Sequence, residues 1–188
     1  MAGYVIHVAI AKEYLRKHKN IEENEQDFIN GTIVPDLTDD KSKTHYGEAS
    51  SETDLNYYLS ENVVDNSFQK GYFLHLLVDR LFYNYYFDIK KIRKEMNIKI
   101  SDYIYDDYDK LNKDLIEKYN VVLSLELQKF TNIKEGKTKI LDLNIIEKMI
   151  DEISDLDLSI VINELKQYKY FNLKGRKIIW KWKLILQV

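Results

Sequence analysis

The chain has 188 residues and no cysteine, with 28 lysines and arginines against 31 aspartates and glutamates and a net charge of -3. This length predicts one domain with its own hydrophobic core, and the lack of cysteine excludes disulfides and thiol chemistry. Because the charges of both signs are interspersed, no basic surface for extended nucleic acid is expected.

The amino-terminal stretch, residues 1–11, is apolar but short and has no basic leading region. We therefore interpret it as mature sequence and not as a signal peptide. No segment approaches the roughly 18 uninterrupted apolar residues of a membrane span. Together with the missing cysteine, these features predict a soluble cytoplasmic protein.

Apolar residues recur at spacings of three and four, and only one proline and six glycines interrupt the chain. This pattern predicts an all-α, single-domain bundle of roughly six to eight helices. The polar segment 38–50 is expected to be a loop, and Ser51, Asp65 and Ser101 are the expected helix caps. The expected helices cover about residues 5–15, 22–30, 51–59, 68–87, 102–119, 121–130 and 145–165.

The last segment departs from the helical pattern. In IIWKWKLILQV both tryptophans, Trp180 and Trp182, alternate with basic and apolar residues as they would in a strand. We therefore divide the chain into a helical domain, residues 1–175, and a C-terminal apolar and basic segment, residues 176–188. Two interpretations stay open: an arm packed on the helices, or a segment that contacts a membrane surface or a partner.

One helical turn in the sequence GYFLHLLVDRLFY carries the strongest chemical signal. Its His75 and Asp79 have i, i+4 spacing and point from the same helix face, which is apolar enough to be buried. A buried His/Asp pair needs partners. Other segments offer His7 in the first apolar stretch, Asp36 after the only proline, and His45 in THYG. Three imidazoles and two carboxylates form a ligand set that suits zinc.

Each histidine also has a simpler interpretation. His7 alone is typical of a core histidine, His45 alone of an ordinary loop residue, and His18 lies in the solvated basic run RKHK. The combination of the segments and their order favour a shared site for His7 and His45. His18 is expected to have no functional role.

Two further residue patterns are interpreted as structural. Asp102, Asp106 and Asp109 share one face of a predicted helix, and we expect a solvated acidic face there and not a metal site. The fifteen tyrosines follow helical spacing. This spacing favours core packing over the stacking of nucleic-acid bases.

The order of the His/Asp segments resembles the zinc-dependent phospholipase C and P1-type nuclease superfamily of all-helical phosphoesterases. The likeness covers about the first 90 residues through VIHVA, GTIVPD, THY and GYFLHLLVD. It implies a second zinc ion that shares Asp79 and binds His7, and it gives Asp36 the further role of the base that orients the attacking water. The implied ligands of the first zinc ion are Asp36, His45, His75 and Asp79.

The chain departs from that family in two ways. The exported enzymes complete one metal with the amino group and carbonyl of a mature amino-terminal tryptophan, whereas this chain begins with MAG. Family members also place a further metal on two histidines and a glutamate downstream, but no histidine follows His75 here. We therefore expect one or two zinc ions and no trinuclear cluster.

The resemblance predicts a phospholipase C-like hydrolase that cleaves a phosphodiester or phosphomonoester in a small substrate, either a lipid headgroup or a nucleotide. Thr44, Tyr72 and Asn84 are available to support the ligands. Two alternatives remain. The chain is a non-catalytic helical scaffold with a structural metal or a buried His/Asp network, or it is a module that binds a partner or a membrane surface.

Overall fold

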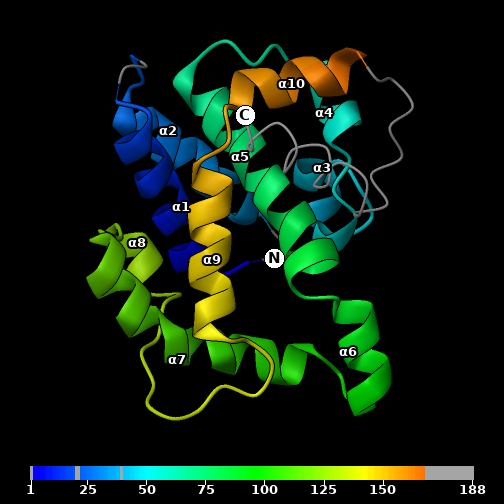
Figure 1. The fold of residues 1–188 in the computed structure, drawn as a ribbon, viewed down its shortest axis with the longest axis vertical. Helices are drawn as coiled ribbons and strands as arrows, with labels where there is room; N and C mark the ends of the chain where they lie inside the picture. Colours follow the sequence, from blue (N-terminus) through cyan, green and yellow to red (C-terminus); the bar gives the residue numbers. More distant parts are fainter. Residues whose placement is uncertain (1, 20–21, 39, 168–188) are drawn as a thin grey trace.

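The computed structural model describes residues 2–19, 22–38 and 40–167. Within these residues the chain forms ten α-helices and no strand, and eight of the helices have seven or more residues. The predicted all-α, single-domain bundle is therefore confirmed (Figure 1).

The described α-helices range from four to nineteen residues in length. The α-helices are α1 (Tyr4–Lys17), α2 (Glu25–Ile33), α3 (Lys41–His45), α4 (Leu55–Glu61), α5 (Ser67–Leu81), α6 (Ile89–Met96), α7 (Ser101–Tyr119), α8 (Leu125–Gln128), α9 (Leu143–Ser154) and α10 (Leu158–Gln167). Two 3-10 turns and one π-helical turn complete the order: η1 (Val34–Asp36), η2 (Ser50–Glu52) and η3 (Phe82–Tyr86).

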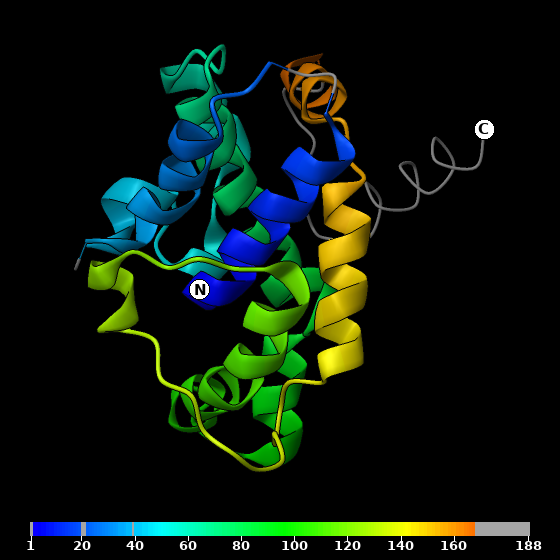
Figure 2. The ribbon, with the colours of Figure 1, turned by 90° about the vertical axis from the view of Figure 1, so that its left-hand side faces the viewer.

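Helix α1 is the centre of the bundle. It packs against α2 and α5 on one side and against α9 and α7 on the others, as Figures 1 and 2 show. Its residues 5–11, VIHVAIA, are buried almost completely. A helical segment that is surrounded by other helices has no solvent-facing side, and this accounts for the apolar run. The only histidine in that run, His7, is thereby carried into the interior.

Helices α2 and α5 cross with their backbones in close contact. A Cβ atom on Gly31 would lie 2.0 Å from the carbonyl oxygen of Phe68, and one on Gly71 would lie 2.0 Å from that of Phe28. Any side chain at either glycine would separate the two helices. This crossing brings the last turn of α2 beside the middle of α5.

Side chains cap several helices, but not always those expected. Asp54, not Ser51, caps α4 by accepting from the Tyr57 amide, and Asn66, not Asp65, caps α5. Residue 101 is already helical instead of capping α7. These corrections move each boundary by a few residues, because several residues near each boundary have side chains able to cap.

The other differences concern element type. The expected loop 38–50 contains α3, the expected helix 121–130 is only α8, and α6 was not expected. The expected helix 145–165 is interrupted at residues 155–157, where Asp157 accepts from the amides of residues 159 and 160 and opens α10. That aspartate offers the backbone a local hydrogen bond that competes with a continuous helix.

The division of the chain at residue 175 and the strand-like C-terminal segment 176–188 lie outside the described residues. Among the residues that are described, we find no helix with the length and apolar character needed to cross a membrane.

Candidate metal centre

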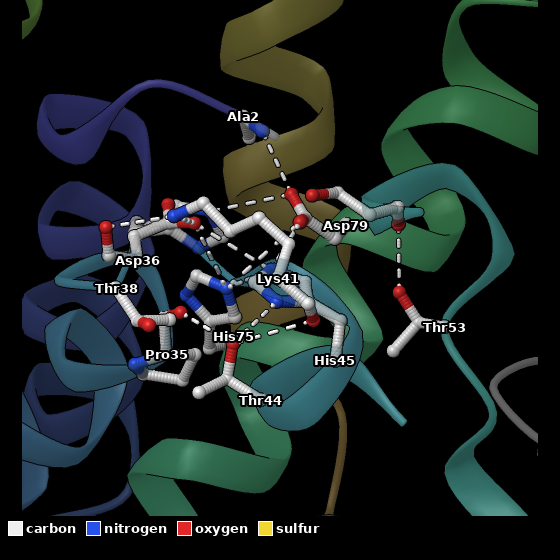
Figure 3. A network of polar contacts seen from close by, with 12 residues as sticks. Ala2, Pro35, Asp36, Thr38, Lys41, Thr44, His45, Thr53, His75 and Asp79 are labelled. Carbon is white, nitrogen blue, oxygen red and sulfur yellow. Dashed lines mark hydrogen bonds and ion pairs between the residues drawn. The ribbon is translucent and has the colours of Figure 1, made fainter. Parts of the chain in front are cut away.

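The five residues predicted to form one site lie together in the interior. His7 comes from α1, Asp36 from η1, His45 from the end of α3, and His75 and Asp79 from α5; all five are buried. Figure 3 shows how the side chains from the last three elements converge. Thus the turn η1, the short helix α3 that soon follows it and the more distant helix α5 place side chains in one region.

His75 is held in a single orientation. Its Nδ1 lies 2.8 Å from the carbonyl oxygen of Thr32, which can only accept, so Nδ1 carries the proton. Nε2 is therefore left with its lone pair, directed into the centre. The close crossing of α2 and α5 places the Thr32 carbonyl where it can do this.

His45 is oriented in the same way by a side chain. The Thr44 hydroxyl donates to the carbonyl oxygen of Pro35 at 2.8 Å, so its oxygen accepts from Nδ1 of His45 at 3.0 Å. Tyr72 donates to the Thr44 carbonyl at 2.7 Å and fixes the same turn. Of the three residues available to support the centre, Thr44 and Tyr72 hold the turn that carries His45, whereas Asn84 donates to the carbonyls of residues 51 and 80.

Four candidate ligand atoms face one another in the centre: Asp36 Oδ1, His45 Nε2, His75 Nε2 and Asp79 Oδ2. The nitrogens are 3.2 Å apart; His45 lies 3.5 Å from Asp36 and 3.2 Å from Asp79, and His75 lies 3.9 and 3.8 Å from them. A zinc ion with bonds of 2.0–2.1 Å to four such atoms would hold them about 3.3 Å apart. The five distances lie near that spacing.

Asp79 faces two directions. While Oδ2 belongs to the set of four, Oδ1 accepts from the Ala2 backbone amide at 2.7 Å and lies 3.4 Å from Nε2 of His7. The His7 ring stacks on that of His75, with centroids 4.0 Å apart. The bridging role that the resemblance implies for Asp79 is compatible with this geometry, and His7 and Asp79 Oδ1 would supply two ligands of a second site.

The centre has polar atoms that the described residues leave unsatisfied. Both ring nitrogens of His7, Asp36 Oδ2 and Asp79 Oδ2 are buried without a hydrogen-bond partner. Two overlapping triads, His7/His75/Asp79 and Asp36/His45/His75, keep their ligand atoms within 4.8 Å of one another. Since unpaired buried acceptors are costly, the residues present fit a bound cation.

The protonation states favour the ligand forms. Complete burial, reinforced by the nearby His7, lowers the pKa of His75 to about 3, so this imidazole is neutral at neutral pH. Burial would raise the pKa of Asp36, but the nearby imidazoles of His45 and His75 favour its charged form more strongly and lower that pKa to about 2. The pKa of Asp79 also falls well below its usual value against the effect of burial, helped by the imidazoles of His45 and His7, whose Nε2 atoms lie 3.2 and 3.4 Å from its carboxylate oxygens.

The pKa of His45 moves in the opposite direction. Burial lowers it, but the carboxylates of Asp36 and Asp79, 3.5 and 3.2 Å from its Nε2, raise it more, and the net shift is upward. Without a metal ion, a proton on His45 Nε2 is therefore the competing way to satisfy the two carboxylates.

Besides the Ala2 amide, sequence reasoning missed Lys41. Its ammonium donates to Oδ1 of Asp36 at 2.9 Å and to the Asp36 carbonyl at 2.7 Å, and its side chain is 27% exposed. In Figure 3 the Lys41 side chain extends across the centre toward Asp36. The signal available in the sequence was weak, because Lys41 lies in a segment rich in lysine that was expected to be a loop.

The remaining candidates lie elsewhere. His18 contacts the carbonyl of Ser154 at 3.1 Å at the end of α1 and takes no part in the centre. Asp106 and Asp109 both pair with Lys134 near the surface. The charge of the predicted solvated acidic face is thus partly neutralised by lysine.

Two pockets in the described part of the molecule are lined by none of the five site residues. A groove of about 630 Å³ lies along α2 and α8. A smaller pocket of about 250 Å³ is lined by Tyr4, Tyr105, Tyr108 and Asn112 among others. Tyr4 links this smaller pocket to the centre, because its hydroxyl donates to the Asp36 carbonyl at 3.1 Å.

No protein-family model, curated protein or solved structure matches this chain. The case for its function therefore depends on its own residues and their geometry.

Proposed function

We propose that this chain is a zinc-dependent phosphoesterase that cleaves a small phosphodiester or phosphomonoester, such as a lipid headgroup or a nucleotide. The observation that carries the proposal is the buried set of four candidate ligand atoms, two of them imidazole nitrogens that face each other 3.2 Å apart. Two neutral acceptors at this distance repel each other unless a cation or a proton lies between them. The proposed ligands are His7, Asp36, His45, His75 and Asp79.

Catalysis requires that one of the four ligands leave its position to water or substrate. Four protein ligands close a tetrahedral site, as in structural zinc centres, whereas catalytic centres keep one position for water or substrate. Asp36 is the ligand best placed to give up its position to water or substrate, because its Oδ1 is already shared with Lys41. It also lies nearest to solvent, since the partly exposed residues Lys41 and Tyr4 both contact its carbonyl.

The side chains of the chain then have distinct tasks. Zinc, when bound, supplies Lewis acidity that lowers the pKa of water to about 7 and polarises a phosphoryl oxygen. Asp36, ionised because its pKa is about 2, accepts a hydrogen bond from the attacking water and orients it. The tyrosine-lined pocket beside Tyr4 receives the rest of the substrate.

The competing explanation is a buried His/Asp network without catalysis. The raised pKa of His45 favours it, since a protonated His45 would donate to Asp79 at 3.2 Å and relieve the repulsion without a metal ion. Metal content and turnover separate these explanations.

The first measurement is the metal content of protein purified without a chelator or affinity histidines. We expect about one or two equivalents of zinc, because the ligand set is complete for one ion and half complete for a second. A content below about 0.2 equivalents of any transition metal, after equilibration with zinc, would contradict the proposal.

The second measurement is hydrolysis of bis-nitrophenyl phosphate by the zinc-loaded protein and by Asp36→Asn. Because the amide introduced at this position cannot accept a proton, we expect turnover to fall by about 100-fold or more while the circular dichroism spectrum stays unchanged. Asp65→Asn, at an exposed aspartate far from the centre, is the matched control and should keep full activity. Zinc-loaded protein that hydrolyses neither diesters nor monoesters would instead support a structural metal.

A further inference from the structure

Lys41 introduces a positive charge at an edge of the centre that solvent reaches. The five metal-ligand candidates are buried, but the Lys41 side chain is 27% exposed while its ammonium lies 2.9 Å from Asp36 Oδ1. Lys41 begins α3, the helix that ends with His45, so the same short element supplies a ligand and this cation. Its position relative to the centre is thus set by the fold.

The two contacts of the ammonium differ in kind. The Asp36 carbonyl oxygen, at 2.7 Å, is a backbone acceptor that stays in place whatever the carboxylate binds. The bond to Oδ1, in contrast, competes with any cation held in the centre, because Oδ1 also faces Nε2 of His45 and of His75. An ammonium has three hydrogens. With the carbonyl as anchor, the others can turn toward an anion at the exposed edge.

We propose that Lys41 binds the phosphoryl group of the substrate, an inference that rests on the proposed function. An ammonium is a compact charge well suited to phosphate. The phosphoryl oxygens would then lie between Lys41 and the position of Asp36, with the remainder of the substrate directed past Tyr4 into the 250 Å³ pocket. Lys41 therefore determines affinity for the anion and does not hold the metal.

The experiment compares Lys41→Met with Lys43→Met, both on α3. Lys43 is the matched control, because its side chain is 80% exposed and pairs with Asp40 away from the centre. For zinc-loaded proteins we measure KM and kcat for bis-nitrophenyl phosphate, the inhibition constant of inorganic phosphate, and zinc affinity. Lys41→Arg, which keeps the charge, tests whether charge alone suffices.

In Lys41→Met we expect KM and the phosphate inhibition constant to rise about tenfold, as for the loss of one charge-assisted hydrogen bond at a partly exposed site. Its kcat should change less than about threefold, and Lys41→Arg should restore most of the affinity. Zinc affinity should stay equal or rise, because Asp36 Oδ1 loses a competitor. Lys43→Met should match the wild type throughout.

Unchanged KM and phosphate inhibition in a folded Lys41→Met would overturn the inference, as would loss of zinc, which would make Lys41 a structural support. Calorimetric titration of zinc-loaded protein with inorganic phosphate keeps the test separate from catalysis. If the wild type binds phosphate about tenfold more tightly than Lys41→Met but hydrolyses no ester, Lys41 is an anion-binding residue and only the proposed hydrolysis fails. Equal binding by both proteins contradicts the role of Lys41.

Discussion

At the scale of single residues, the centre depends on which nitrogen of each imidazole carries the proton. Nδ1 of His75 donates a hydrogen bond to the Thr32 carbonyl, and Nδ1 of His45 donates one to the Thr44 hydroxyl. Both Nε2 atoms therefore face the centre as acceptors. Metal ligation by histidine commonly uses this arrangement, in which the second nitrogen is fixed by a hydrogen bond. The orientation therefore exists before any ion binds.

The burial of His75 makes the metal-free protein sensitive to mild acid. Its pKa is about 3 in the folded state and about 6.5 when unfolded, so the unfolded chain binds more protons between these values and stability falls as pH drops below about 6.5. The pKa of His45 is raised, so its stabilising contribution is fully present below about pH 6.5. His45 therefore does not change how the free energy of unfolding varies with pH in that range. Carboxylates titrate mainly at lower pH.

We therefore expect the free energy of unfolding, measured with urea in EDTA, to fall from pH of about 6.5 to about 5 by up to about 1.4 kcal/mol per pH unit. His75→Asn should lose this slope, because the asparagine does not titrate. His18→Gln should keep it. An equal slope in His75→Asn and the wild type would show that another group is responsible.

The sequence predicted the five centre residues as one set, and the structure brings them together. Their prediction was possible because a His/Asp pair on one apolar helix face demands buried partners and the chain has few histidines. Lys41 and the Ala2 amide were missed for a physical reason. A surface-type lysine and a backbone amide have no sequence pattern of their own, and only the tertiary fold places them against Asp36 and Asp79.

At the scale of elements, the crossing of α2 and α5 positions the centre. It brings the Thr32 carbonyl to His75 and leads α2 directly into η1, where Pro35 turns the chain and Asp36 follows. Gly31 and Gly71 make this approach possible, since each faces a backbone carbonyl of the other helix. Helix packing and ligand geometry are therefore coupled.

Gly71→Ala tests this coupling. In an unconstrained helix, alanine would stabilise by up to about 1 kcal/mol over glycine. Here its Cβ would meet the Phe28 carbonyl, so we expect a loss of about 3 kcal/mol in urea unfolding together with weaker zinc binding. Asn30→Ala, on the exposed face of α2, should lose neither. Stabilisation by Gly71→Ala would mean that the helices are farther apart.

The elements were predictable to the extent that apolar periodicity specifies them. The long helices α1, α5 and α7 follow from their spacing, and the predicted residues 68–87 are helical throughout 68–86, although the last turn is π-helical. The failures have local causes: Asp157 opens a new helix, and α6 is a short, highly charged helix whose apolar stripe consists of only Ile89, Ile92 and Met96. Helix α3 has only five residues, too few for periodicity to reveal.

At the scale of the whole molecule, the centre lies where several elements of the core meet. Its five side chains come from α1, η1, α3 and α5, and α1 also contacts α7 and α9. A cation that binds here joins segments between residues 7 and 79 that are separate in the unfolded chain. Because the unfolded chain has no preformed site, the binding free energy adds to the stability of the fold.

Zinc should therefore raise the melting temperature of the whole domain. At a free concentration about 100 times Kd, the added stability is about 2.7 kcal/mol. For a chain of this size that corresponds to a shift of about 5–10 °C in a calorimetric scan. Magnesium, which prefers oxygen ligands, should shift the transition little.

Asp79→Asn is the decisive variant for this prediction, because Asp79 offers an oxygen to each side of the centre. It should abolish the zinc-dependent shift, whereas His18→Gln, at a histidine outside the centre, should keep it in full. An equal shift in both variants would place the zinc on the surface and remove the basis for a metal centre. A shift confined to proteins with intact Asp79 would show that the ion binds where the helices converge.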